Sequence, residues 1–112
     1  MDRREKGAQS EEAAARYLTQ QGYRILQRNF RWKGGEIDII AQRNGLLVFV
    51  EVRARSYSAF GFAAETINSS KKEKIKRTAL LYLQKRRLDC PARFDVITFD
   101  GDKLEHIENA FD

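Results

Sequence analysis

The dipeptide Asn44-Gly45 constrains the fold of this chain more than any other feature, because it stands between two runs of apolar residues. A two-residue turn of type I′ needs a positive φ at both central positions, and Asn-Gly adopts it readily. The flanking runs, residues 36–42 and 46–53, are rich in Ile, Val, Leu and Phe and have the length of strands. The sequence therefore predicts a tight antiparallel hairpin here.

The turn also determines which residues face each other. Arg43 then pairs with Leu46, and the same register continued along both strands puts Asp38 opposite Glu51. Opposed residues of an antiparallel ladder have Cβ atoms about 4.5–5.5 Å apart, and like charges placed so are destabilising. The two carboxylates therefore need a cation between them, a shared proton or a nearby base.

A divalent metal ion satisfies this need. Mg²⁺ (or Mn²⁺) is typically held by one or two carboxylates together with waters and substrate phosphate oxygens. Such an ion activates water and stabilises the charge that develops on a phosphodiester. Arg53 is expected on the same face, where it could hold a phosphate through two hydrogen bonds. The sequence thus predicts a metal-dependent site for phosphate chemistry.

The alternative is an ordinary surface, in which Glu36 pairs with Arg53 across the hairpin and the two carboxylates are solvated. Strands that are apolar on both faces are usually central and covered, however. Alternation puts Ile37, Ile39, Val50 and Val52 on one face of the hairpin and Ile40, Leu47 and Phe49 on the other. The acidic pair is therefore expected at the rim of a buried sheet.

The remaining elements predict a single α/β domain that spans residues 1–112. A first helix over residues 3–21 ends at Gly22, and Ser70-Lys71-Lys72-Glu73 matches a capping box that begins a second helix. The order of helix, three strands, helix and two strands favours a mixed sheet with a helix on each face. Besides the hairpin, the expected elements are strands at 23–32, 93–99 and 103–108 and a second helix to about residue 87.

Positive charge is concentrated in one segment of the chain. The net charge is +5, but residues 70–87 carry eight basic residues against Glu73 alone, which gives +7 there and leaves −2 for the remainder. Such a cluster favours a phosphate-bearing partner. Lys72, Lys74 and Arg77 are predicted to grip a nucleic-acid backbone without reading its sequence.

The segment 55–62 interleaves basic and aromatic residues. Arg55 and Tyr57 are predicted to contact nucleic acid, because aromatic rings beside phosphate-binding groups can stack on splayed bases. Phe60 and Phe62 can instead anchor this segment to the core. The sequence is compatible with both roles of this segment, contact with nucleic acid and anchoring to the core.

Several classes of protein are excluded by what the chain lacks. The longest apolar run, 46–50, is far too short to cross a bilayer, and the N-terminus has no apolar signal segment. A cytoplasmic location without a membrane partner is therefore expected. One Cys (Cys90) and one His (His106) cannot build a zinc site, so any metal would be held by carboxylates. Asp95, on a later strand, is expected to be structural.

The run Gly35-Glu36-Ile37-Asp38-Ile39-Ile40-Ala41 resembles a motif of the small bacterial YraN-like proteins. The resemblance extends to 48–55, Ser70-Lys71, Arg93-Phe94-Asp95-Val96-Ile97 and Asn109-Ala110-Phe111, which is nearly the whole chain. That family is uncharacterised but is similar to archaeal Holliday-junction resolvases and the wider PD-(D/E)XK nucleases. The resemblance implies a restriction-endonuclease-like fold, Mg²⁺-dependent hydrolysis of DNA and a homodimer.

The resemblance also assigns roles to residues. It makes Asp38 and Glu51 the metal-binding carboxylates, and Glu11 the first-helix glutamate that completes the site. Glu11 shares a helical stripe with Ala8, Ala15 and Leu18, although it could equally be a carboxylate at the helix rim. These assignments predict a catalytic and metal site made by two strands and the first helix.

Arg53 takes the position of the superfamily's lysine. Arginine stays protonated and cannot act as a base, but it can stabilise a charged phosphate. Lys71 lies on the inner stripe of the second helix and could reach the site, or it could be a solvated first-turn lysine.

Three hypotheses of function remain. The first is a structure-selective, Mg²⁺-dependent endonuclease that acts on DNA. The second is a non-catalytic nucleic-acid-binding module that retains the nuclease fold. The third is a protein-interaction module whose basic face meets an acidic protein.

Overall fold

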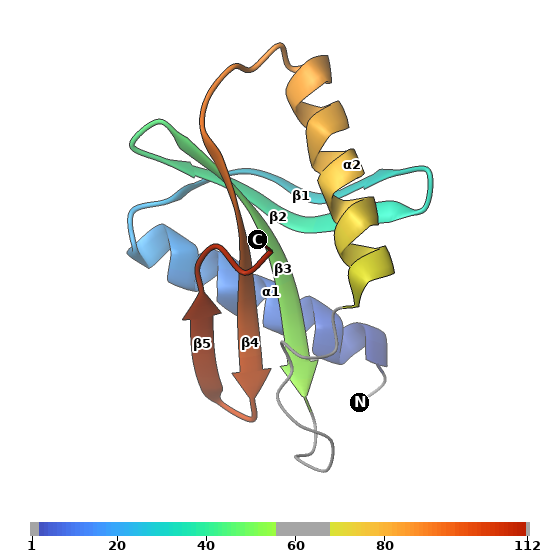
Figure 1. Ribbon diagram of the computed structural model, residues 1–112. Helices are drawn as coiled ribbons and strands as arrows, with labels where there is room; N and C mark the ends of the chain where they lie inside the picture. The colour runs from blue at the N-terminus through green and yellow to red at the C-terminus, as the bar shows by residue number, and fades with distance from the viewer. Residues whose placement is uncertain (1–2, 56–67, 112) are drawn as a thin grey trace.

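The computed structural model describes residues 3–55 and 68–111 and has the element order predicted from the sequence (Figure 1). Two helices and five strands alternate as α-β-β-β-α-β-β. Their bounds are α1 (Arg3–Gln20), β1 (Arg24–Trp32), β2 (Gly35–Arg43), β3 (Leu46–Arg55), α2 (Ser69–Lys85), β4 (Ala92–Asp100) and β5 (Lys103–Ile107).

The five strands form one mixed sheet in the order β1-β2-β3-β4-β5. β3 and β4 are parallel, because α2 carries the chain from the end of one strand back to the start of the next. The other neighbouring strands are antiparallel. The predicted mixed sheet is therefore confirmed.

One helix packs on each face of the sheet. On the α1 face, Ala14 and Leu18 pack with Ile39, Val48 and Val50. Each fully buried aliphatic side chain contributes about 1.5–3 kcal/mol to folding. Tertiary burial of this kind supplies most of the stability of α1, as it does for most helices in proteins.

On the other face, α2 buries Ile75, Thr78, Ala79 and Tyr82. These side chains pack mainly on Phe49 and its neighbours in the central strands.

In α1 the predicted stripe is buried at Ala15 and Leu18, but Ala8 is exposed. Within the described ranges, no helix is long and apolar enough to cross a membrane.

The Asn44-Gly45 turn has the predicted geometry. Asn44 has φ 53° and Gly45 has φ 78°, as a type I′ turn requires. Five pairs follow in the predicted register, from Arg43–Leu46 to Ile39–Val50. The hairpin is confirmed over this length.

The ladder between β2 and β3 ends one step before Asp38 and Glu51. Ile37 packs with Ile40 on the α2 face, so the prediction that it shares a face with Ile39 was wrong. Side-chain alternation is broken at Asp38, and Asn29, which lies across from it on β1, has φ 54°. Past this irregularity Asp38 no longer sits in a regular pair.

The start of α2 also differs from the prediction. The helix begins at Ser69, and Asn68 is its N-cap, with Oδ1 accepting a hydrogen bond from the Lys71 amide at 2.9 Å. The predicted capping box at Ser70 was therefore wrong, because asparagine, one of the strongest N-cap residues, precedes it. The helix ends at Lys85, two residues before the predicted end.

Candidate active site

The candidate site lies where β2 and β3 stop pairing. Asp38 Oδ2 accepts a hydrogen bond from the Val52 amide at 2.8 Å. Because the β2–β3 ladder ends before this point, the Val52 amide of β3 has no backbone partner in β2. The carboxylate of Asp38 accepts its hydrogen bond instead. The bond fixes Asp38 beside the strand that carries Glu51.

Glu51 is buried, with 6% of its surface exposed. Two cations neutralise it. Lys71 Nζ, which comes from the first turn of α2, lies 3.0 Å from Glu51 Oε1, and Arg53 Nη2 lies 3.4 Å from the same oxygen. Lys71 therefore reaches the site from the second helix, and its first turn is positioned by the Asn68 cap, which the sequence reading missed.

Asp38 is held in a different electrostatic state. Burial, followed by the negative charge of Glu51, raises the pKa of Asp38 to about 7. The hydrogen bond from Val52 opposes this rise, while Glu11 and Glu36 add to it. The repulsion predicted between the acidic groups is therefore relieved at neutral pH partly by a proton on Asp38 and partly by the lysine and arginine beside Glu51.

Glu11 faces the same acidic group from α1. Burial raises the pKa of Glu11, with further contributions from Glu36 and Glu51, although Arg28 acts in the opposite direction. Its Oε1 atom is buried and has no hydrogen-bond partner. An unsatisfied buried carboxylate oxygen is costly, and a cation or a donor brought to it would be stabilised.

The chemistry of these donors fits a hard divalent cation. Asp38 and Glu51 offer carboxylate oxygens, and Glu11 adds an oxygen without a partner. In residues 3–55 and 68–111, no three Asp, Glu, His or Cys side chains come together closely enough to hold a metal ion. Two carboxylates nonetheless suffice for Mg²⁺, which keeps several of its waters.

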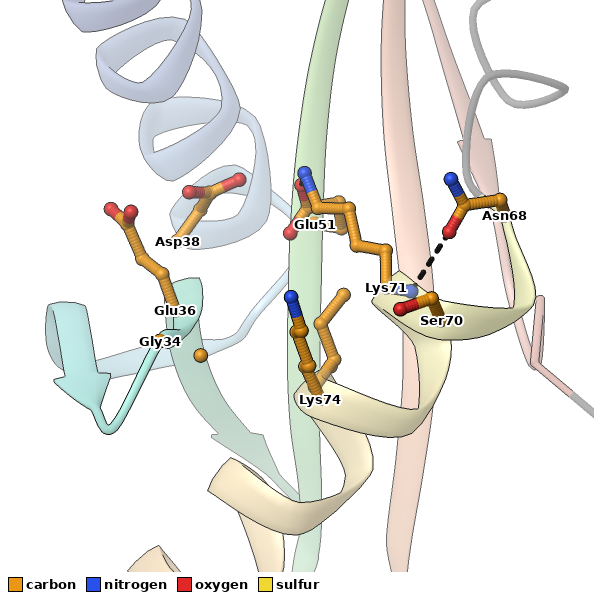
Figure 2. Close-up of a pocket in the computed structure, with 10 residues that line it drawn as sticks. Gly34, Glu36, Asp38, Glu51, Asn68, Ser70, Lys71 and Lys74 are labelled. Atoms are coloured by element: carbon orange, nitrogen blue, oxygen red, sulfur yellow. Dashed lines mark hydrogen bonds and ion pairs between the residues drawn. The ribbon is translucent and has the colours of Figure 1, made fainter.

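Asp38 and Glu51 line a pocket of about 350 Å³ between the sheet and α2. Figure 2 shows Asp38, Glu36 and Glu51 on the strand side, with Lys71 and Lys74 on the helix side. An acidic wall thus faces a basic wall. Its described lining is Gly34, Gly35, Glu36, Asp38, Glu51, Asn68, Ser70, Lys71, Lys74 and Ile75.

The alternative reading of an ordinary surface, with Glu36 paired to Arg53, is wrong, because each of these residues makes another contact. Glu36 lies 3.4 Å from Arg31, its neighbour on β1. Arg53 instead turns toward Glu51 on its own strand, and its Nε atom is buried without a hydrogen-bond partner. The guanidinium therefore belongs to the acidic site rather than to the hairpin surface.

The predicted nucleic-acid contacts divide between two flanks of α2. Lys74 and Arg77 line a groove on the side of the β1–β2 hairpin. Lys72 lies on the opposite flank, with Nζ 5.8 Å from the ring centre of Phe111. Tyr57, Phe60 and Phe62 lie outside the described residues, as does the side chain of Arg55.

A second buried aspartate, Asp95 on β4, is fully compensated. Arg93 donates hydrogen bonds of 2.8 Å to both of its oxygens, His106 Nε2 lies 2.7 Å from Oδ2, and the Asn109 amide donates to Oδ1. Burial opposes ionisation, but the hydrogen bonds from His106, Arg93 and Asn109 outweigh it and lower the pKa of Asp95. A structural role is consistent with this closed network.

Comparison with known proteins identifies relatives along almost the whole chain. Residues 10–99 match the model of a family described as "Uncharacterised protein family UPF0102". A UPF0102 protein of Persephonella marina is 47% identical, over 96% of this chain and 93% of its own length. Another from Thermodesulfovibrio yellowstonii is 44% identical over 99% of both chains.

A third relative, a UPF0102 protein of Trichlorobacter lovleyi, is 48% identical over 95% of this chain and 89% of its own. Identity of this size along most of both chains indicates a shared fold, and the names of these relatives assign no activity. The chain, with its mixed sheet between two helices and its acidic pocket at the end of the β2–β3 ladder, belongs to the uncharacterised family UPF0102.

Proposed function

We propose that this protein is a Mg²⁺-dependent endonuclease that hydrolyses phosphodiester bonds of structured DNA. The observation that carries the proposal is the placement of Asp38 and Glu51 at one pocket, with the pKa of Asp38 raised to about 7 by burial and by Glu51. A carboxyl group perturbed in this way, in a pocket with charged partners, is typical of a functional site. The basic wall opposite it suits a polyanionic substrate.

Asp38 and Glu51 would hold the metal, and Glu11 on the α1 side would support it by its negative charge rather than as a third ligand. A bound Mg²⁺ supplies Lewis-acid stabilisation of the phosphate and lowers the pKa of water. The reaction adds water to phosphorus and breaks one P–O ester bond, so that one product carries a phosphate and the other a hydroxyl. The chain's own residues then have to position the phosphate and balance its charge.

Lys71 and Arg53 supply that balance. Each now lies within 3.4 Å of Glu51 Oε1. When Glu51 is engaged by another cation, both side chains are free to donate to phosphate oxygens. Arg53 cannot accept a proton, so its contribution is charge and geometry. Lys71 and Lys74 on α2 would orient the backbone across the pocket.

The proposal is tested by cleavage of labelled duplex, flap and four-way-junction DNA with Mg²⁺ or Mn²⁺. Asp38→Ala is expected to lower the rate at least about 100-fold, the usual cost of losing one preorganised charge-stabilising group. Asp89→Ala, at an exposed carboxylate that lines neither the pocket nor the groove, is the matched control and should cleave like the wild type. Undiminished cleavage by Asp38→Ala would contradict the assigned site.

The second candidate function is a non-catalytic nucleic-acid-binding module. It is favoured by the two cations that already neutralise Glu51, one of which is the arginine at the expected lysine position. DNA binding with a steep salt dependence, and no cleavage with any divalent metal, would favour this function. Failure to bind DNA or RNA at any salt concentration would instead favour a protein-interaction module.

A further inference from the structure

A groove runs between the β1–β2 hairpin and α2, next to the acidic pocket. It has a volume of about 260 Å³, and Gly35 and Lys74 line both the groove and the pocket, so the two cavities are adjacent. Figure 1 shows the hairpin end of β1 and β2 extending beside α2. The described lining is Trp32, Lys33, Gly35, Lys74, Arg77, Thr78, Leu80, Leu81 and Gln84.

Gly35 holds the hairpin and the helix together. A Cβ atom at this position would meet Thr78 Oγ1 and would lie 3.0 Å from the Lys74 carbonyl oxygen. Only glycine permits this approach of the strand to the helix. This close contact fixes the position of the two walls of the groove, the hairpin on one side and α2 on the other.

Charge and shape indicate what the groove can hold. Three cations line it, namely Lys33, Lys74 and Arg77, and none of the described lining residues is acidic. The lining also includes exposed apolar side chains, with Leu80 55% exposed and Trp32 41% exposed. Cations beside apolar and aromatic side chains match a chain of phosphates that carries unstacked bases.

The indole ring of Trp32 is the feature by which the groove would distinguish a single strand from a duplex. Lys85 Nζ lies 4.3 Å from the centre of the indole ring and Lys33 Nζ lies 5.7 Å from a ring centre of Trp32. An incoming base can replace the Lys85 ammonium on the ring, and the ammonium can then meet the phosphate of that nucleotide. In a duplex the bases are already stacked and cannot reach the ring.

We infer that this groove binds an unpaired strand of nucleic acid, with one base stacked on Trp32 and its phosphates held by Lys33, Lys74 and Arg77. Lys74 and Lys85 are about 16 Å apart along the helix axis, which gives room for a short run of nucleotides. The inference rests on the proposed function and names its substrate class. The substrate is nucleic acid with a single-stranded branch, which lies along α2 beside the acidic pocket.

Trp32 is the one tryptophan of the chain, so its fluorescence reports on the groove directly. We expect a short oligothymidylate to quench this fluorescence in EDTA, where no cleavage occurs. A blunt duplex with the same number of phosphates should leave the fluorescence nearly unchanged. Equal quenching by the oligothymidylate and the duplex, or quenching by neither, would overturn the inference. Fluorescence that changes with protein concentration in the absence of nucleic acid would also overturn it, because the groove would then bind a second copy of the chain.

Variants separate the groove from general electrostatics. In fluorescence anisotropy with labelled oligothymidylate, Trp32→Ala should weaken binding about 10-fold and Trp32→Phe less. Neither should change binding of blunt duplex, a difference that a merely structural role of Trp32 would not produce. An unchanged Kd for the single strand in Trp32→Ala would contradict the inference.

Lys76 offers a matched control for charge on the same helix. Arg77→Gln is expected to weaken single-strand binding several-fold, while Lys76→Gln, at an exposed position outside the groove, should have less effect. Equal losses would assign binding to net charge and overturn the inference. Because binding is measured in EDTA, the groove can fail while cleavage of duplex persists, and cleavage can fail while the groove binds.

Discussion

Asp38 and Asp95 are aspartates of neighbouring regions of one sheet, and their surroundings are opposite. Asp95 is fully buried, and an arginine, a histidine and a backbone amide bond its two oxygens. Asp38 receives one backbone hydrogen bond and faces Glu51, Glu11 and Glu36. The pKa of Asp95 is therefore lowered, whereas that of Asp38 is raised to about 7.

The negative charge of Asp95 is balanced by hydrogen-bond donors within the fold, whereas the acidic neighbours of Asp38 oppose its ionisation. The network of Asp95 satisfies the charge with groups from β4, β5 and the segment that follows β5. Asp38 has no comparable network among the described residues and lies beside the acidic side chains of Glu51, Glu11 and Glu36. A domain most readily retains a destabilising group of acidic side chains where a bound ligand relieves their repulsion.

The largest effect is expected at Asp95. Asp95→Ala removes the buried carboxylate that Arg93, His106 and the Asn109 amide contact, and breaking a buried pair typically costs about 3–5 kcal/mol. The melting temperature should fall by more than about 10 °C at pH 7, as measured by circular dichroism. Asp89→Ala serves as the exposed control, and a change in Asp95→Ala no larger than in this control would refute the structural role.

Asp38→Asn is expected to act with the opposite sign. The folded pKa of about 7 lies above the ordinary value of 3.8, so the unfolded chain ionises first and stability is lost as the pH rises from about 4 to about 7. The asparagine oxygen can still accept from Val52 without a charge. At pH 8 the variant should melt about 5–10 °C higher than the wild type, with little difference at pH 4.5.

This prediction has a clear contrary result. If Asp38→Asn melted below the wild type at pH 8, or if the difference were the same at both pH values, the carboxylate would not be destabilised by its neighbours. Asp38 would then resemble Asp95, and the contrast between the two sites would be lost.

Divalent metal should stabilise the protein through the acidic pocket. At 100 times its Kd a ligand of the folded state contributes about 2.7 kcal/mol, so saturating Mn²⁺ should raise the melting temperature by several degrees at pH 8. The rise should be smaller at pH 5, where Asp38 holds its proton, because the metal must displace it. An equal rise in Asp38→Asn would place the metal elsewhere.

Glu11 should have the smallest effect. Its Oε1 atom is buried without a partner, but the carboxylate lies on α1 rather than on the two strands of the pocket. Glu11→Gln is therefore expected to weaken Mn²⁺ binding about 10-fold, as supporting groups around a metal commonly do. Calorimetric titration measures this change, and an affinity equal to that of the wild type would remove Glu11 from the site.

Most of the fold could be predicted because its signals are local. Asn44-Gly45 alone fixes five pairs of the hairpin, since only residues that tolerate positive φ form this turn. The helical stripe that includes Ile75 and Tyr82 follows from spacing. The N-cap was mistaken because Ser70 and Asn68 both carry suitable side chains, and the choice depends on where the preceding segment enters.

The detail of the candidate site could not be predicted, because it depends on contacts between distant residues. The irregularity at Asp38 involves Asn29 on β1 and the Val52 amide on β3, and no periodicity within β2 signals either one. The placement of Trp32 beside α2 depends on the approach of Gly35 to Thr78. Spacing alone therefore identified the acidic residues but not the shape around them.

The most direct test of the metal site is the anomalous scattering of Mn²⁺ in crystals grown with this ion above pH 7. We expect a peak within about 2–2.3 Å of carboxylate oxygens of both Asp38 and Glu51, with Lys71 moved away from Glu51. Full Mn²⁺ saturation in solution without a peak at these two residues, or with Lys71 still paired to Glu51, would contradict this expectation.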